Sequence, residues 1–159
     1  MTGDATFEDG AEAPLRLIAQ GPDDLPIVSA LVQDAVFPST EMTWDRPARR
    51  FALLLNRFRW EDRPRAEKQK RAYERVQSVL VIGDVLRVAS TGIDRADRDL
   101  VLSLLSISFE PGEDGAGDII LTLAGDGAIR LSVECVDMTL TDVTRPYVAP
   151  SGKAPNHTG

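Results

Sequence analysis

The feature that most constrains the fold is an apolar period of two residues that recurs along most of the chain. It is clearest in DIILTLAGDGAIRLSVEC, residues 118–135, where apolar side chains alternate with others on both sides of Gly125-Asp126-Gly127. Alternation of this kind is typical of half-buried strands, and a short Gly-Asp-Gly segment between two such runs predicts a hairpin. Most of the core must therefore come from one face of a sheet.

The other β-type segments are short and closely spaced, and several contain an irregularity. In RRFALLLNRFRW, residues 49–60, the apolar phase moves to Phe58 and Trp60, which predicts a bulge near Asn56. In RVQSVLVIGDVLRVAS, residues 75–90, Gly83-Asp84 predicts either a two-residue hairpin or a bulge in one long strand. The connections are too short for repeated crossovers, so the strands should pair antiparallel.

One segment has a helical pattern instead. GPDDLPIVSALVQDAV, residues 21–36, places proline and acids in a first turn and then apolar side chains three and four residues apart. The predicted fold is α+β, with a mainly antiparallel, strongly curved sheet or partly closed barrel of about seven or eight strands and one N-terminal helix. We expect a single globular domain over residues 14–148 between flexible tails, residues 1–13 and 149–159.

Several kinds of chemistry lack the residues that they need. The single cysteine, Cys135, excludes an intramolecular disulfide, fits a reducing cytoplasm and is expected to be buried. The single histidine, His157, falls in a predicted tail, where nothing would hold it as a general base or a metal ligand. We therefore expect no catalytic residue, metal or cofactor, although the sequence leaves enzymatic activity open. The sequence also shows no export signal and no apolar run of membrane-spanning length.

Charge is strongly segregated in this acidic chain. The segment from residue 46 to residue 75 carries a net charge of +7, whereas the remaining residues together carry −14. We expect this segment, residues 46–75, to bind a protein or an anionic ligand through Arg57, Arg59, Arg63 and Arg65, with the basic stretch that follows Trp60 forming a loop. The alternative is that these side chains pair with acids of the same molecule. A sequence pI near 4.7 disfavours nucleic acid as the partner.

A second cluster of charges follows at residues 94–99. Asp94, Arg95 and Asp97 suggest a carboxylate–arginine site, as in an enzyme or a protein that binds a metal or another ligand. The alternative is that the aspartates hold backbone N–H groups of a turn while the arginines pair with them. The two tryptophans, Trp44 and Trp60, fall on predicted strands and should contribute to the core. The expected oligomeric state is a monomer or a weak homodimer formed through a sheet edge.

Three stretches carry a resemblance to a known family. FALLLNRF, STGIDRADRDLVLSLLSISFEPGED and IRLSVEC resemble the bacterial family of domains of unknown function called DUF2948, over about Leu15 to Asp142. The resemblance implies a single cytosolic domain and supplies no activity. Because the family lacks a turn pair where this chain has Gly83-Asp84, the resemblance favours a bulge there over a hairpin.

Overall fold

The computed structural model of the chain describes residues 13–148 and residue 155. The two predicted tails lie almost entirely outside these ranges, and so does His157. None of the helices in the described part is long and apolar enough to cross a bilayer.

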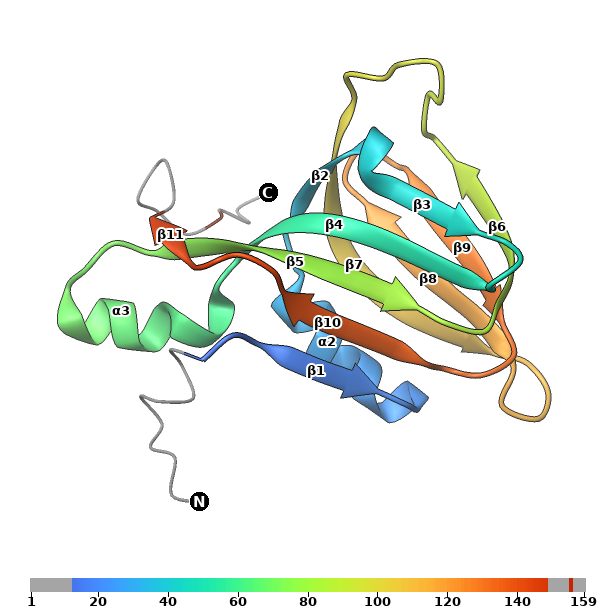
Figure 1. The fold of residues 1–159 in the computed structure, drawn as a ribbon, viewed down its shortest axis with the longest axis horizontal. Coiled ribbons are helices and arrows are strands. Elements are labelled where there is room, and N and C mark those ends of the chain that lie inside the picture. The colour runs from blue at the N-terminus through green and yellow to red at the C-terminus, as the bar shows by residue number, and fades with distance from the viewer. Residues whose placement is uncertain (1–12, 149–154, 156–159) are drawn as a thin grey trace.

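Strands make up most of the described chain, and the helical segments are short (Figure 1). The strands are β1 (Arg16–Ala19), β2 (Val36–Pro38), β3 (Met42–Asp45), β4 (Arg50–Phe58), β5 (Glu74–Ile82), β6 (Val85–Thr91), β7 (Val101–Pro111), β8 (Gly117–Leu123), β9 (Ala128–Val133), β10 (Met138–Asp142) and β11 (Tyr147–Val148). The helices are α2 (Leu25–Leu31) and α3 (Arg63–Gln69), together with the 3-10 turns η1 (Pro22–Asp24), η2 (Ser39–Glu41) and η3 (Trp60–Asp62).

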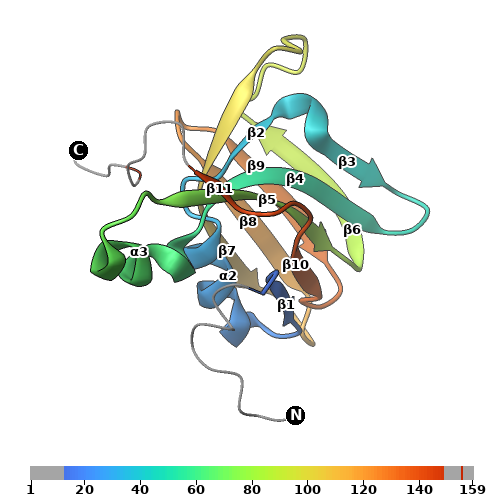
Figure 2. The same cartoon turned by 60° about the vertical axis from the view of Figure 1, so that its left-hand side comes forward.

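All of these strands join one antiparallel sheet. Its order is β1-β10-β5-β4-β2-β7-β8-β9-β6, with β11 added beside β5 and β3 beside β4. The prediction of a mainly antiparallel, sheet-dominated fold is confirmed, whereas the predicted number of strands is too low. Figures 1 and 2 show that the sheet curves around its interior. The curved sheet is not closed, because β6 and β1 end the order without pairing with each other.

The core follows the alternation that the sequence shows. In β4 the side chains of Phe51, Leu53 and Leu55 are buried, and the neighbouring strands turn Leu80 of β5 and Leu140 of β10 into the same interior. The predicted hairpin around Gly125-Asp126-Gly127 is confirmed, since β8 and β9 pair directly across it. Burial of these apolar faces is the main driving force for the fold.

The predicted N-terminal helix is present but shorter than its sequence pattern. Pro22 opens the 3-10 turn η1, and Pro26 is accommodated in the first turn of α2. The helix buries Leu25 and Val28 against the core, and its Ser29 hydroxyl accepts a hydrogen bond of 2.9 Å from the backbone N–H of Ile107. That N–H lies beside an irregularity in the β7–β8 pairing, so the helix satisfies a donor near the distorted part of the ladder.

The prediction of a single helix and a basic loop is wrong. The stretch after β4 forms η3 and then α3, which lies at one end of the molecule in Figures 1 and 2. Pro64 falls at the start of α3, where proline is tolerated. The helix ends at Gln69. The next residue, Lys70, caps it with a left-handed backbone conformation, with φ of 55°. Trp60 therefore lies on η3 rather than on a strand, and its indole N–H donates to the Gln33 carbonyl.

The two predicted irregularities also have different structures. Strand β4 keeps its register with β5 past Asn56, so the expected bulge is absent. Gly83-Asp84 is neither a hairpin nor a bulge, because β5 pairs with β4 and β10 whereas β6 pairs with β9. The chain crosses at this point from one part of the curved sheet to its far edge. A two-residue period cannot distinguish such a crossing from a turn, because both only interrupt the alternation.

Candidate functional site

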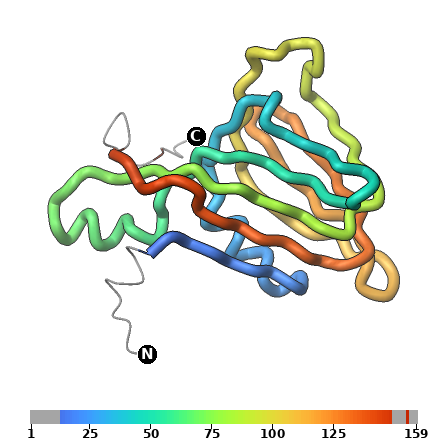
Figure 3. Tube along the Cα trace, in the orientation of Figure 1, coloured from blue at the N-terminus to red at the C-terminus, as the bar shows by residue number. Residues whose placement is uncertain are grey.

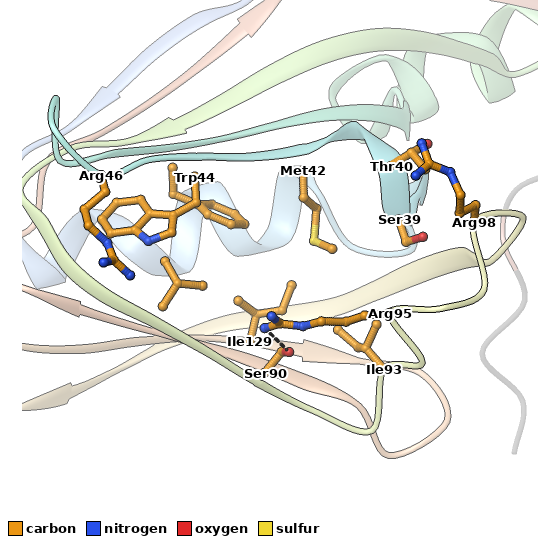
Figure 4. A pocket seen from close by; sticks show the side chains of 12 residues that line it. Ser39, Thr40, Met42, Trp44, Arg46, Ser90, Ile93, Arg95, Arg98 and Ile129 are labelled. Carbon is orange, nitrogen blue, oxygen red and sulfur yellow. Dashed lines mark hydrogen bonds between the residues drawn. The ribbon is translucent and has the colours of Figure 1, made fainter.

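A cleft of about 500 Å³ lies between strands β3 and β6, where the curved sheet fails to close (Figure 4). Strand β3 pairs only with β4, and β6 pairs only with β9, among the described residues. Side chains of both strands line the cleft. The volume lies within the range of small-molecule sites, about 300–1,000 Å³.

Backbone hydrogen bonds close this cleft at both ends. At one end the N–H of Val85 donates to the carbonyl of Arg49 at 2.9 Å. At the other end the N–H of Ser39 donates to the carbonyl of Leu100, also at 2.9 Å. A polypeptide that paired with β3 or β6 would need to pass these ends, so the shape favours a compact ligand over an inserted strand.

The lining combines an apolar interior with a cationic rim. Its apolar members are Met42, Trp44, Phe51, Val88, Ile93 and Ile129, and its polar members are Ser39, Thr40, Ser90, Arg46, Arg95 and Arg98. None of these described lining residues is an aspartate or a glutamate. Figure 4 shows the aromatic and aliphatic side chains between the two strands, with the arginines around them.

Two local features of the sequence build the cleft. The alternation in and after β3 brings Met42, Trp44 and Arg46 to the same side, and Trp44 is only partly buried because it faces the opening. After β6 the chain turns at Gly92, where φ is +70° and a Cβ atom would lie 3.0 Å from the Asp126 carbonyl oxygen. Only glycine fits such a turn without strain. Gly92 starts the loop of residues 92–100, which joins β6 to β7 (Figure 3). This loop carries Arg95 and Arg98.

The aspartates of this loop shape it and leave its arginines without carboxylate partners. The Asp94 carboxylate accepts from the N–H of Ala96, and that of Asp97 accepts from the N–H of Asp99, each at 3.0 Å. These are the turn contacts that the sequence suggested. The accompanying expectation of arginine–aspartate pairs is not met, because Arg95 donates to the Ser90 hydroxyl at 2.9 Å instead.

Neither Arg46 nor Arg98 forms an ion pair or a hydrogen bond within the described part of the chain. All three lining arginines are exposed, so their charges are available to a ligand without a desolvation penalty in the free protein. The cleft therefore presents three guanidinium groups around an apolar interior.

The basic segment is organised differently, and Arg57 shows this most clearly. Its side chain is 0% exposed and occupies the inward position that follows Phe51, Leu53 and Leu55 in β4. It forms a bidentate pair with Glu61 at 2.8 Å and donates to Asp142 of β10 at 2.9 Å. Its Nε also donates to the Ser78 hydroxyl, which itself donates to Asp142 at 2.7 Å. This residue is a buried internal anchor.

The other three arginines chosen from the sequence are also largely engaged. Arg59 is 5% exposed and pairs with Glu74. Arg63 is exposed on α3 and pairs with Glu67 at 2.9 Å, one helical turn away. Arg65 is half-buried. In the structure, Arg57, Arg59 and Arg63 therefore form ion pairs with acidic residues of the same molecule.

Burial and charge shift several pKa values in this network. Burial opposes the charged form of Arg57, but its hydrogen bonds to Glu61 and Asp142 and their charges raise its pKa above the ordinary value. Burial also opposes ionisation of Asp62, yet hydrogen bonds from Arg71, with the charges of neighbouring arginines, lower the Asp62 pKa. Both groups therefore remain charged near neutral pH.

A second cleft, of about 450 Å³, opens beside this network. Arg59, Glu74 and Asp142 contribute to its wall, so acids and bases are mixed there. Because these groups already pair with one another or with Arg57, the second cleft offers less unpartnered charge than the first.

The expectation of a buried Cys135 is wrong. Its thiol is exposed and lies 3.2 Å from a carboxylate oxygen of Asp84. The hydrogen bond to Asp84, together with burial and the nearby charges of Asp137 and Glu134, raises the pKa of the thiol. A raised pKa lowers the thiolate fraction, which disfavours a nucleophilic role.

The described residues contain no group of three or more His, Cys, Asp or Glu side chains arranged to hold a metal ion. Sequence reasoning found Arg95 but missed Trp44, Arg46 and Arg98 as parts of one site. They come from segments about fifty residues apart that only the sheet topology brings together.

The fold and the cleft define a small antiparallel-sheet domain with a cationic, apolar-floored cleft at the open side of its sheet. Residues 15–157 match the family described as protein of unknown function (DUF2948), and the chain belongs to that family. The resemblance seen in the sequence is thereby confirmed. No curated protein and no solved structure matches the chain.

Proposed function

We propose that the chain is a non-catalytic binding module whose ligand is a small molecule with an anionic group and an apolar body, held in the cleft between β3 and β6. The observation that carries this proposal is the lining itself. Three guanidinium groups surround apolar side chains, and no described carboxylate shares the lining. Guanidinium pairs well with carboxylate or phosphate, and an apolar interior favours a ligand that removes apolar surface from water.

The lining also supports binding rather than catalysis. Its only hydroxyl groups belong to Ser39, Thr40 and Ser90, and no histidine or carboxylate stands among the described lining residues to act as their base. A serine or threonine nucleophile needs such a base. The carboxylate–arginine alternative is less well supported, because Asp94 and Asp97 hold turn N–H groups while Arg95 belongs to the cleft.

The cleft, rather than the basic segment, is the better site for an anion. Arg57 and Arg59 are buried and paired, so a ligand would have to displace carboxylates that already bind them. Breaking a buried pair is costly, whereas Arg46, Arg95 and Arg98 are exposed. The interaction module expected from the sequence thus remains a proposal, with a different set of arginines.

The test compares octanoate with octanamide, which has the same chain length but no charge. We expect octanoate to raise the thermal midpoint and to change the fluorescence of Trp44 in a Trp60→Phe background, and octanamide to do so about tenfold more weakly. Loss of one charge-assisted contact corresponds to about 1.4 kcal/mol, or tenfold in affinity.

The Arg95→Gln variant should weaken octanoate binding by about the same factor. Arg63→Gln is the matched control, because it removes one exposed arginine from α3 without touching the cleft. Equal binding of octanoate and octanamide, or an equal loss in the two variants, would contradict the proposal.

A further inference from the structure

Two of the three cationic groups of the cleft, Arg46 and Arg98, lie at its opposite ends. Arg46 follows directly after β3 and lies beside Trp44, whereas Arg98 lies beside Thr40 at the other end (Figure 4). The backbone bonds agree with this placement. The Arg49–Val85 bond closes the cleft near Arg46, and the bond between Ser39 and Leu100 closes it near Arg98.

The length of strand β3 sets a lower limit on the distance between these two ends of the cleft. From Met42 to Asp45 the strand rises by about 3.4 Å per residue, or about 10 Å in all, and Thr40 and Arg46 lie beyond its two ends, so the ends of the cleft lie at least about 10 Å apart. At this distance a single carboxylate cannot contact both Arg46 and Arg98. A monoanion therefore pairs with at most one of these two arginines.

The wall between the two ends is apolar. Met42 and Phe51 approach from the β3 side, and Val88 and Ile129 from the β6 side. Arg95 is held by Ser90 near this middle part, where Figure 4 shows its guanidinium between the ends. The cleft thus presents one arginine at each end and, between them, an apolar wall with the guanidinium of Arg95 beside it.

From this arrangement, and resting on the proposed function, we infer that the ligand class is a dianion whose two anionic groups are joined by an apolar spacer of about 10 Å or more. One anionic group pairs at Arg46 and the other at the Arg98 end, while the spacer covers the apolar wall. Such a ligand contacts both terminal arginines and the apolar wall at once, and its two charges balance an excess of positive charge that a monoanion leaves in part unpaired.

The experiment measures the affinities of suberate, octanoate and succinate by calorimetry. Suberate and octanoate share their chain length, and succinate has two charges on a shorter spacer. We expect suberate to bind about tenfold tighter than octanoate, and succinate to lose this advantage because it cannot reach both ends.

Two variants locate the second contact. Arg46→Gln should reduce the suberate-to-octanoate affinity ratio to near one, whereas the control Arg63→Gln should keep the wild-type ratio. The inference is overturned if suberate binds no tighter than octanoate, or if Arg46→Gln leaves the ratio unchanged. In either case octanoate binding would still support the proposed function. The proposed function itself fails if neither suberate nor octanoate binds.

Discussion

Replacing Arg57 with methionine is expected to lower the free energy of unfolding by about 3–5 kcal/mol. The substitution keeps an unbranched, flexible stem but removes the guanidinium cation from the interior. Asp142, whose side chain is only 4% exposed, would then stand buried beside Ser78 without its positive partner. Glu61 is less affected, because a quarter of its side chain already reaches solvent. Urea denaturation with a two-state fit measures the change.

Three further variants separate this explanation from a general loss of packing. Arg63→Met removes an exposed arginine of the same segment and should cost less than about 0.5 kcal/mol. Arg57→Lys keeps the charge but loses the bidentate geometry, so its stability should be intermediate. Adding Asp142→Asn to Arg57→Met should restore part of the loss. A change below about 1 kcal/mol for Arg57→Met would show that the buried network is not an anchor.

Neutralising all three arginines of the cleft should abolish most ligand binding without unfolding the protein. In the Arg46→Gln, Arg95→Gln, Arg98→Gln triple variant, we expect the affinity for suberate to fall about a hundredfold, since two charge-assisted contacts are lost at about tenfold each. The free energy of unfolding should change by less than about 0.5 kcal/mol, because the three side chains are exposed and form no ion pair within the described residues.

The control for this variant removes the same number of charges from α3 and its end. Arg63→Gln, Lys68→Gln and Lys70→Gln alter the net charge equally, so any long-range effect of net charge is matched. We expect this second triple variant to bind suberate within about twofold of the wild type. If it loses as much affinity as the first, the loss is not specific to the arginines of the cleft, and the cleft is not the binding site.

The sheet was predictable because its alternation is local. Residues 118–135 specify a hairpin through neighbouring positions alone, and the structure forms it. The crossing at Gly83-Asp84 and the cleft were not predictable in this way. They depend on which distant strands pair, and β6 pairs with β9, about forty residues further along the chain.

The buried network left a signal in the sequence that an apolar pattern search misses. Arg57 and Asp142 each take the next inward position after alternating apolar residues of β4 and β10, and Ser78 interrupts the inward apolar row of β5, on three strands that pair in turn. The shift of the apolar phase to Phe58 and Trp60 predicted a bulge near Asn56 instead. A charge at an inward position is costly unless it is paired, as Arg57 is. Three polar interruptions in separate strands are better explained together, as partners in one buried cluster.

The most direct test of the central claim is amide chemical-shift mapping of the chain during a titration with suberate. The account predicts that the largest shifts fall in β3, in β6 and in the loop of residues 92–100, with little change in α3. Shifts concentrated in α3 and around Arg63, or no saturable shift at any amide, would contradict the assignment of the cleft as the binding site.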